Sequence, residues 1–400
     1  MKRKQCSNCI LDDSIPNVEI LSNGLCNFCN DYELNKVVKA RMNRIFASRM
    51  EKIFQNPGEN MYDVAVMFSG GKDSAMLLKM AKEKYHLRTL AVSVMHPLIN
   101  KIAKQNIDDV AKKLQVDVVK IQIQEDVFKK VIRQALVHGK EYDLNEFVGC
   151  DVCNFLFMWV ALKMSMRLRI PTILEGSDKS QNGAYFIEGK KVDQKISKGI
   201  MPYGRLHDIV RDALGEEMKG SIYGCEIEDL KKYKYPNVIA PFMFTDYSFK
   251  DNFNHISQMG LDSNKFRSIV TNCDAVPFFS YIALKRFGCI SYVKHFANEI
   301  RNKYPNISQL SLDDKIQSTI LEKEKLKSVL NEYEDILNYV VDNNLNDQNV
   351  DEAQMESIMN RMGSEFTEYY GLQVSKILVD QILQIHKYCK YFDIDLDEIQ

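Results

Sequence analysis

The chain has 400 residues, enough for a large hydrophobic core or for two or three domains. Its composition, 45% hydrophobic and 27% charged, is ordinary for a globular protein, and the formal net charge is -1. A protein that mainly binds tRNA or DNA would more often be distinctly basic, so nucleic acid is disfavoured as the main partner. No apolar window approaches the roughly 18 residues of a membrane span, and no apolar stretch follows the basic N-terminus as in a secretory signal. We therefore expect a cytoplasmic protein with no membrane segment.

The first predicted segment, residues 1–35, holds four cysteines in two CxxC pairs, Cys6 with Cys9 and Cys26 with Cys29. Because no export signal precedes them, we expect reduced thiols rather than disulfides. Two such pairs at this spacing are typical of a tetrahedral four-cysteine zinc site, whose closed ligand shell is structural. The segment is too short to bury a core of its own, so zinc would supply its folding energy.

Residues 36–60 are predicted to form a helical connector, and residues 61–304 an α/β domain in which strand-like runs alternate with helical patterns. Short connections between such elements favour a doubly wound, mostly parallel sheet. Ligands of these sheets bind at the carboxyl ends of the strands. Strands are expected at 64–68, 89–94, 116–123 and 171–175, and helices at 73–85, 99–114, from 126 and at 154–168.

The sequence Ser69-Gly70-Gly71-Lys72-Asp73-Ser74 follows the first of these strands and opens a helix. The two glycines allow the backbone to approach a phosphate, and free N–H groups of the helix N-terminus point at it. Ser69 and Ser74 add hydroxyl donors. Lys72 adds a positive charge, and Asp73 can cap the helix or hold magnesium. The loop is not a Walker A motif, because that pattern needs a glycine at position 66 and a hydroxyl residue after the lysine.

Two further features are expected near the same strand ends. Gly176-Ser177-Asp178 follows the strand at 171–175, and Asp178 is either a second acidic residue of the nucleotide site or a plain turn residue. Cys150 and Cys153 form a third CxxC pair before the helix at 154–168. This pair has three interpretations: a redox-active or persulfide-carrying pair, two ligands of an iron–sulfur cluster with Cys225 or Cys273 as the third, or a structural metal site or packed free thiols.

The last predicted segment, residues 305–400, has apolar side chains at helical spacing. We interpret it as a helical packing or dimerisation region, which leaves a homodimer open. Cys289 and Cys389 lie in apolar surroundings and are predicted to be core residues.

The S-G-G-x-D-S loop after a strand resembles the PP-loop of N-type ATP pyrophosphatases, which have an adenine nucleotide alpha hydrolase-like sheet. The resemblance implies an enzyme that uses ATP and Mg²⁺ to adenylate a carbonyl or amide oxygen and releases pyrophosphate. A nitrogen or sulfur nucleophile then displaces AMP. The loop would bind the nucleotide, and Lys72, Asp73, Asp178 and the Cys150/Cys153 pair are the expected catalytic residues. An ATP-binding module without catalysis is the alternative.

The cysteine-containing run from Cys6 to Tyr32, followed by the PP-loop, resembles the N-acetyl sugar amidotransferase family over roughly residues 1–300. Members are linked to O-antigen and to nonulosonic acid synthesis of the pseudaminic acid type. The resemblance implies that an N-acetyl sugar or sugar nucleotide is the substrate, and that ammonia from a partner glutaminase turns the N-acetyl group into an acetamidino group. The helical region after 305 is atypical of the family.

The chain is also similar to tRNA thiolases with N-terminal zinc knuckles, in its PP-loop and in a mid-chain CxxC pair followed by a lone cysteine. That resemblance implies an alternative function, sulfur transfer to tRNA or to a small molecule, with a sulfur donor protein as partner. The second pair of knuckles that the closest thiolases carry near the C-terminus is missing here. Together with the near-neutral charge, this makes nitrogen the nucleophile that the sequence favours.

Overall fold

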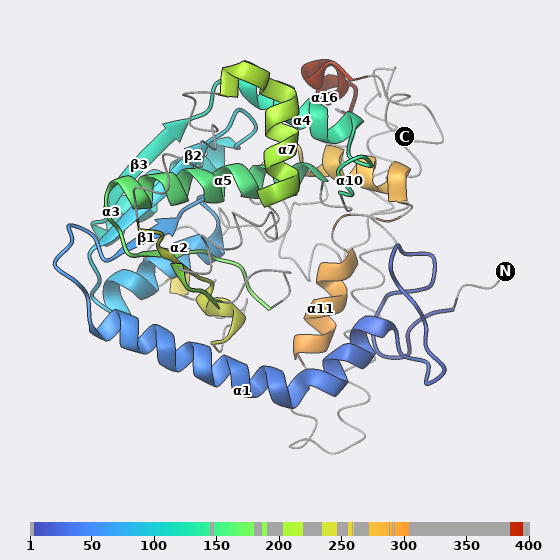
Figure 1. The fold of residues 1–400 in the computed structure, drawn as a ribbon, viewed down its shortest axis with the longest axis horizontal. Helices are drawn as coiled ribbons and strands as arrows, with labels where there is room; N and C mark the ends of the chain where they lie inside the picture. Colours follow the sequence, from blue (N-terminus) through green and yellow to red (C-terminus); the bar gives the residue numbers. More distant parts are fainter. Residues whose placement is uncertain are drawn as a thin grey trace.

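The computed structural model describes residues 4–144, 148–179, 186–189, 203–218, 234–245, 255–257, 259, 272–287, 289, 291, 293–303 and 385–394. Within these residues, six strands form one sheet in the order β3-β2-β1-β4-β6-β5 (Figure 1). All neighbouring strands are parallel except β5, which is antiparallel to β6 at the sheet edge. The predicted α/β class with a mostly parallel sheet is therefore confirmed. The strands are β1 (Val64–Met67), β2 (Thr89–Met95), β3 (Asp117–Gln122), β4 (Thr172–Leu174), β5 (Phe186–Ile187) and β6 (Asn237–Ile239).

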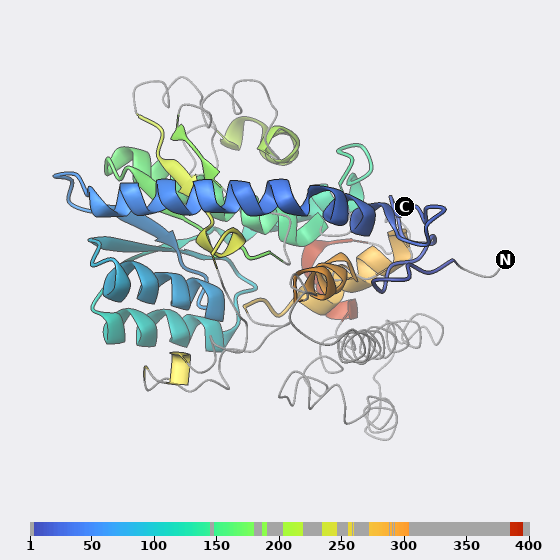
Figure 2. The same ribbon diagram turned by 90° about the horizontal axis from the view of Figure 1, so that it is seen from below.

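Helices cover both faces of the sheet (Figure 2). Side chains alternate along a strand, so Val64 and Val66 pack into a core shared with α2 and α3. Ala65 and Ile173 pack into the opposite core, shared with α4 and α5. The sheet is thus doubly wound, as predicted. These helices are α2 (Lys72–Lys79), which continues into a π-helical turn at Met80–Lys84, α3 (Lys101–Leu114), α4 (Glu125–Val137) and α5 (Val148–Arg167).

A long helix, α1 (Asn27–Gln55), joins the N-terminal cysteine segment to the sheet domain (Figure 1). Cys26 caps its N-terminus by accepting a hydrogen bond from the Cys29 N–H. Near its other end, Phe54 is buried, and its ring lies 4.7 Å from the Tyr85 ring in an edge-on contact. The helix begins inside the predicted zinc module and runs through most of the predicted connector, so the two segments share one element.

Three shorter helices lie beyond the sheet, and all three contribute buried residues to the α5 side of the core. In α10, Phe278 and Phe279 pack against Phe392 of α16, with ring centroids 5.8 and 6.3 Å apart. α11 lies beside the N-terminal segment (Figure 1). Cys289 and Cys389 are both buried, which confirms their prediction as core residues. The bounds are α10 (Val276–Phe287), α11 (Val293–Lys303) and α16 (Ile385–Phe392).

Most of the region predicted as helical at 305–400 lies outside the described residues; α16 is the part of it that the structure describes. On the opposite side of α4 lies α7 (Tyr203–Leu214), which is followed by a 3-10 turn at Gly215–Met218. No helix among the described residues has the length and hydropathy that a bilayer span requires.

Candidate nucleotide, thiol and metal sites

The turn between β1 and α2 depends on Gly70. Its φ is +78°, in the left-handed region, and a β-carbon at this position would overlap the Ala103 carbonyl. The buried Asn106 of α3 donates from Nδ2 to the Gly70 carbonyl at 3.0 Å. The first residues of α3 and the Asn106 amide therefore fix the loop, and position 70 accepts no side chain unless the backbone moves.

All six residues of the predicted nucleotide loop gather in this turn. Ser69 Oγ lies 3.2 Å from Ser74 Oγ, and Ser74 Oγ donates to the Gly71 carbonyl at 3.1 Å. Lys72 Nζ pairs with Asp73 Oδ2 at 2.7 Å, and their side chains are 9% and 19% exposed. Gly71 is the N-cap of α2, so the first N–H groups of that helix lie here as well. The turn offers hydroxyl groups, backbone N–H groups and a cation to an anionic ligand.

The second polar loop, residues 175–178, lies against the first. β4 pairs with β1, with Leu174 opposite Val66, so both loops leave the sheet side by side. A β-carbon added to Gly176 would lie 3.3 Å from Ser74 N and 3.5 Å from Asp73 Cβ. The Gly176-Ser177-Asp178 turn is therefore in contact with the start of α2, while a role for Asp178 in magnesium binding stays a prediction.

Cys150 and Cys153 lie at the start of α5, which leads into β4 and packs against β1, β2 and β4. A helix that connects parallel strands runs antiparallel to them, so this end of α5 lies at the carboxyl ends of the strands. Gly149 lets α10 pack closely here, because a β-carbon at this position would overlap the Phe279 ring. α10 begins three residues after Cys273, and its contact with α5 brings Cys273 towards the CxxC pair.

Cys150, Cys153 and Cys273 are half-buried residues, and the Cys153 thiol lies within electrostatic range of the other two. Burial raises the pKa of the Cys153 thiol well above its ordinary value, and the neighbouring Cys273 and Cys150 raise it further. Burial also raises the pKa of Cys273 to about 12. The structure thus brings together three of the cysteines that the sequence analysis singled out, whereas Cys225 lies outside the described residues.

The short segment around Asn272 and Cys273 passes between the thiols and the nucleotide loop. Cys273 forms an antiparallel bridge with Ile99, just after β2, and two backbone hydrogen bonds of 3.0 Å flank that bridge. Asn272 Nδ2 donates to Ser69 Oγ at 2.8 Å. This segment therefore contacts the nucleotide loop through Asn272 and carries Cys273 at the next position.

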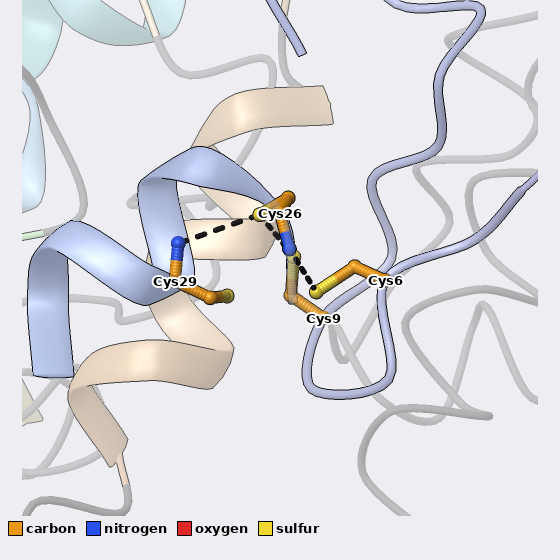
Figure 3. Close-up of side chains that lie close together, drawn as sticks. All are labelled: Cys6, Cys9, Cys26 and Cys29. Carbon is orange, nitrogen blue, oxygen red and sulfur yellow. Dashed lines mark hydrogen bonds between the residues drawn. The ribbon is translucent and has the colours of Figure 1, made fainter. Parts of the chain in front are cut away.

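The four N-terminal cysteines form a tight cluster (Figure 3). All four are buried, and their sulfur atoms lie within 4.8 Å of one another. Backbone N–H groups donate to two of the sulfurs, Cys26 N to Cys6 Sγ at 3.2 Å and Cys29 N to Cys26 Sγ at 3.4 Å. Within the described part of the chain, no other group of three or more histidine, cysteine or acidic side chains is close enough to share one ion. The donor set fits a tetrahedral metal such as zinc.

Arg301 of α11, which is distant in sequence, also contacts this cluster. It is 6% exposed, and its Nη1 atom lies 3.5 Å from both Cys9 Sγ and Cys29 Sγ. Hydrogen bonding, first from Cys26 and also from Arg301, lowers the pKa of the Cys29 thiol to about 6. Four thiolates around one divalent ion carry a net negative charge, which the buried guanidinium would offset.

The family model of the queuosine biosynthesis protein QueC matches residues 63–185. The matched segment runs from the start of β1 past β4, and it includes both the nucleotide loop and the Gly176-Ser177-Asp178 turn. The chain carries a QueC-like PP-loop ATP pyrophosphatase domain. An uncharacterized protein of Methanocaldococcus jannaschii is 38% identical over 142 residues, which are 36% of this chain and 47% of that protein. The match therefore spans about half the length of this curated relative.

Two solved structures show weak overall similarity to the chain. An NMN synthetase from Francisella tularensis has a TM-score of 0.33 at 13% identity, covering 68% of this chain and 93% of that one. The U34-tRNA thiolase NcsA from Methanococcus maripaludis, solved with its [4Fe-4S] cluster, has a TM-score of 0.31 at 13% identity, covering 82% and 88%. Both TM-scores are too low to support an argument about fold or function.

Sequence reasoning missed two polar residues near the PP-loop, Asn106 and Glu175, and it singled out Asn272 only for a family resemblance, without connecting it to the loop. Each carried a weak signal. Asn106 is a lone amide on the apolar face of a helix, and Glu175 is an acid that directly follows an apolar strand. Asn272 belongs to a stretch far along the chain, and no local pattern connects it with Ser69. Burial and long-range packing, which the sequence does not display, give these residues their position.

Glu175 should make the stability of the PP-loop domain depend on pH. Burial raises the pKa of its carboxyl to about 7, against an ordinary value of 4.5, although a hydrogen bond from Ser177 lowers it. The unfolded chain therefore loses this proton first as the pH rises, so the folded state loses stability between about pH 4.5 and 7 and stays destabilised at higher pH. Glu175→Gln should be more stable than the parent protein at pH 8 by up to about 3 kcal/mol, with a smaller difference at pH 5. Urea unfolding of both proteins at the two pH values measures this, and a stability difference that does not grow with pH contradicts it.

Arg301 should tune the affinity of the cysteine cluster for metal. Arg301→Met keeps an apolar stem but removes the guanidinium, and loss of such an outer partner typically weakens metal binding about 10- to 100-fold. Cys26→Ser, which breaks the closed shell, should lose about one zinc per chain outright. Competition with a chromophoric chelator measures both effects. Arg49→Met, at an exposed pair with Glu188, is the matched control. Equal zinc affinity in the Arg301 and Arg49 variants would show that Arg301 plays no part.

Proposed function

We propose that the PP-loop domain adenylates a carbonyl or amide oxygen of a small molecule and that a sulfur atom then displaces AMP. The observation that carries this proposal is the gathering of Cys150, Cys153 and Cys273, together with the hydrogen bond from Asn272, next to Cys273, to Ser69 of the nucleotide loop. Sulfur transfer needs thiols near the activated carbon, whereas amidation needs none. The net charge of -1 supports a small molecule rather than tRNA as the acceptor.

Residues 69–74 would bind the phosphates of ATP. Ser69, Ser74 and the N–H groups around Gly71 donate hydrogen bonds, and Lys72 exchanges its pairing with Asp73 for the phosphate charge. Asp73, together with Asp178 on the adjacent loop, would hold magnesium, which prefers carboxylate and phosphate oxygens. These groups stabilise the charge that develops on pyrophosphate as it leaves.

The two steps balance without an oxidant or a reductant. In the first, the acceptor oxygen attacks the α-phosphorus, the bond to the bridging oxygen breaks and pyrophosphate leaves. In the second, sulfur at the oxidation level of sulfide adds to the activated carbon, the carbon–oxygen bond breaks and AMP departs with the oxygen. The product therefore carries sulfur where the acceptor carried oxygen. A sulfide-generating donor protein is the partner that this chemistry calls for.

The three thiols also fit an iron–sulfur cluster with three protein ligands. Soft thiolates are the ligands that such clusters take. When bound, a cluster of this kind supplies an iron without a protein ligand, at which sulfur can be held. Cys150 and Cys153 on α5 and Cys273 before α10 would be its ligands. The nearby Asn272 contact with Ser69 fixes their position relative to the PP-loop.

Amidation of an N-acetyl sugar or sugar nucleotide is the second candidate. The N-terminal cysteine module favours amidation, since that module carries the resemblance to N-acetyl sugar amidotransferases. The group of four cysteines that the sequence predicts there is present in the structure. The first step would be the same, but ammonia from a glutaminase partner would displace AMP. The thiols would then have no chemical role.

The test supplies anaerobically purified protein with ATP, candidate N-acetyl sugars and sugar nucleotides, and either sulfide or ammonium. Product mass is read by mass spectrometry, and iron and labile sulfide are measured on the same sample. We expect a product with sulfur in place of oxygen, formed only with sulfide. A nitrogen-containing product formed with ammonium would replace this proposal with the second candidate. Nucleotide binding without pyrophosphate release from any mixture would indicate a non-catalytic ATP-binding module.

A further inference from the structure

Glu175 lies where the two polar loops of the site meet. Its N–H donates to the Ile239 carbonyl at 3.0 Å, so strand pairing with β6 continues through this residue. Side chains alternate here: Ile173 packs into the core shared with α5, and Leu174 packs into the opposite core. The alternation places Glu175 on the α5 face, at the carboxyl end of β4. The same face and the same end of the sheet carry the CxxC pair of α5.

Ser177 donates a hydrogen bond to the carboxyl of Glu175. Its pKa is raised to about 7 by burial rather than by a like charge. The elements packed against β4 are β1, β6 and α5. Of these, α5 carries titratable side chains at its N-terminal end: Cys150, Asp151 and Cys153. The next residue, Gly176, lies against Asp73 and Ser74 at the start of α2. A turn held by Ser177 alone would not require an acid at this position, because an amide would serve equally well.

We propose that Glu175 is a catalytic residue that accepts the proton of the incoming nucleophile, a role that rests on the proposed function. Hydrosulfide adds to the adenylated carbon with its S–H bond intact. As the carbon–oxygen bond breaks and AMP leaves, the S–H proton passes to the Glu175 carboxylate, and exchange with solvent restores the carboxylate for the next turnover. Ammonia must lose a proton in the corresponding step, so the assignment holds for either nucleophile. A base that titrates near neutrality suits this task.

The two half-reactions separate this role from the proposed function itself. Formation of the adenylate, measured as exchange of labelled pyrophosphate into ATP with the acceptor present, should not need Glu175. In Glu175→Gln we expect exchange within about twofold of the parent protein and product formation lowered about 100-fold or more. The rise in the rate of product formation near pH 7 should also disappear. Glu175→Asp keeps a carboxylate and should restore part of the rate. Glu188→Gln, at an exposed acid beyond β5, is the matched control and should change neither half-reaction.

The outcomes are distinct. Product formation at the parent rate in Glu175→Gln would overturn the assignment, and so would a loss of exchange as large as the loss of product. If the parent protein itself shows neither pyrophosphate exchange nor AMP, the proposed function fails, and the role of Glu175 fails with it.

Discussion

Replacing Cys273 with alanine should abolish sulfur transfer while leaving ATP binding unchanged. Alanine neither carries sulfur nor binds iron, and Cys273 lies within electrostatic range of Cys153. Asn272, which contacts Ser69, keeps its backbone position because the bridge to Ile99 does not involve the thiol. Product mass spectrometry measures turnover, and calorimetry with a non-hydrolysable ATP analogue measures binding. Cys150→Ala and Cys153→Ala should behave in the same way.

Cys289→Ala is the matched control for these variants. Cys289 is a buried core cysteine that follows α10, and the titration of Cys153 depends on Cys150 and Cys273 rather than on it. Its variant should lose some stability and keep its turnover. If the Cys273 and Cys289 variants are equally active, the thiols have no chemical step and nitrogen becomes the preferred nucleophile.

Lys72→Ala and Ser74→Ala should each lower the rate of pyrophosphate release about 100-fold or more, a loss typical for a donor that stabilises transition-state charge. Both side chains are buried in the turn where α2 begins, and neither supports the hydrophobic core. Circular dichroism should therefore show folded proteins. Lys79→Ala, on the same helix but paired with Glu83 near the surface, is the control. Normal release in both loop variants would remove residues 69–74 from the nucleotide site.

The fold and the nucleotide loop could be predicted from the sequence because the patterns that indicate them are local. Six consecutive residues after an apolar strand define the loop, and the order of strands and helices determines the parallel sheet. The four-cysteine cluster could also be predicted, since two CxxC pairs close together in a sequence usually bind one shared metal ion. Even so, the pattern did not show that α1 begins within the cysteine module or that α2 passes into a π-helical turn.

The remaining parts of the site depend on contacts between distant segments. The sequence offered both Cys225 and Cys273 as partners for the CxxC pair, and packing of α10 against Gly149 is what selects Cys273 among the described residues. Arg301 reaches the cysteine cluster only because α11 docks on it. The raised pKa of Glu175 arises from burial, a property of the folded state that no spacing of residues reveals.

The most direct test of the central claim is the identity of the products formed from ATP. The protein is incubated with ATP, magnesium, a pool of N-acetyl sugars and sugar nucleotides, and sulfide or ammonium, and the nucleotides and phosphates are separated by ion-exchange chromatography. A PP-loop ATP pyrophosphatase yields AMP and pyrophosphate in equal amounts, with neither formed by Lys72→Ala. Formation of ADP and orthophosphate by the parent protein would contradict the account.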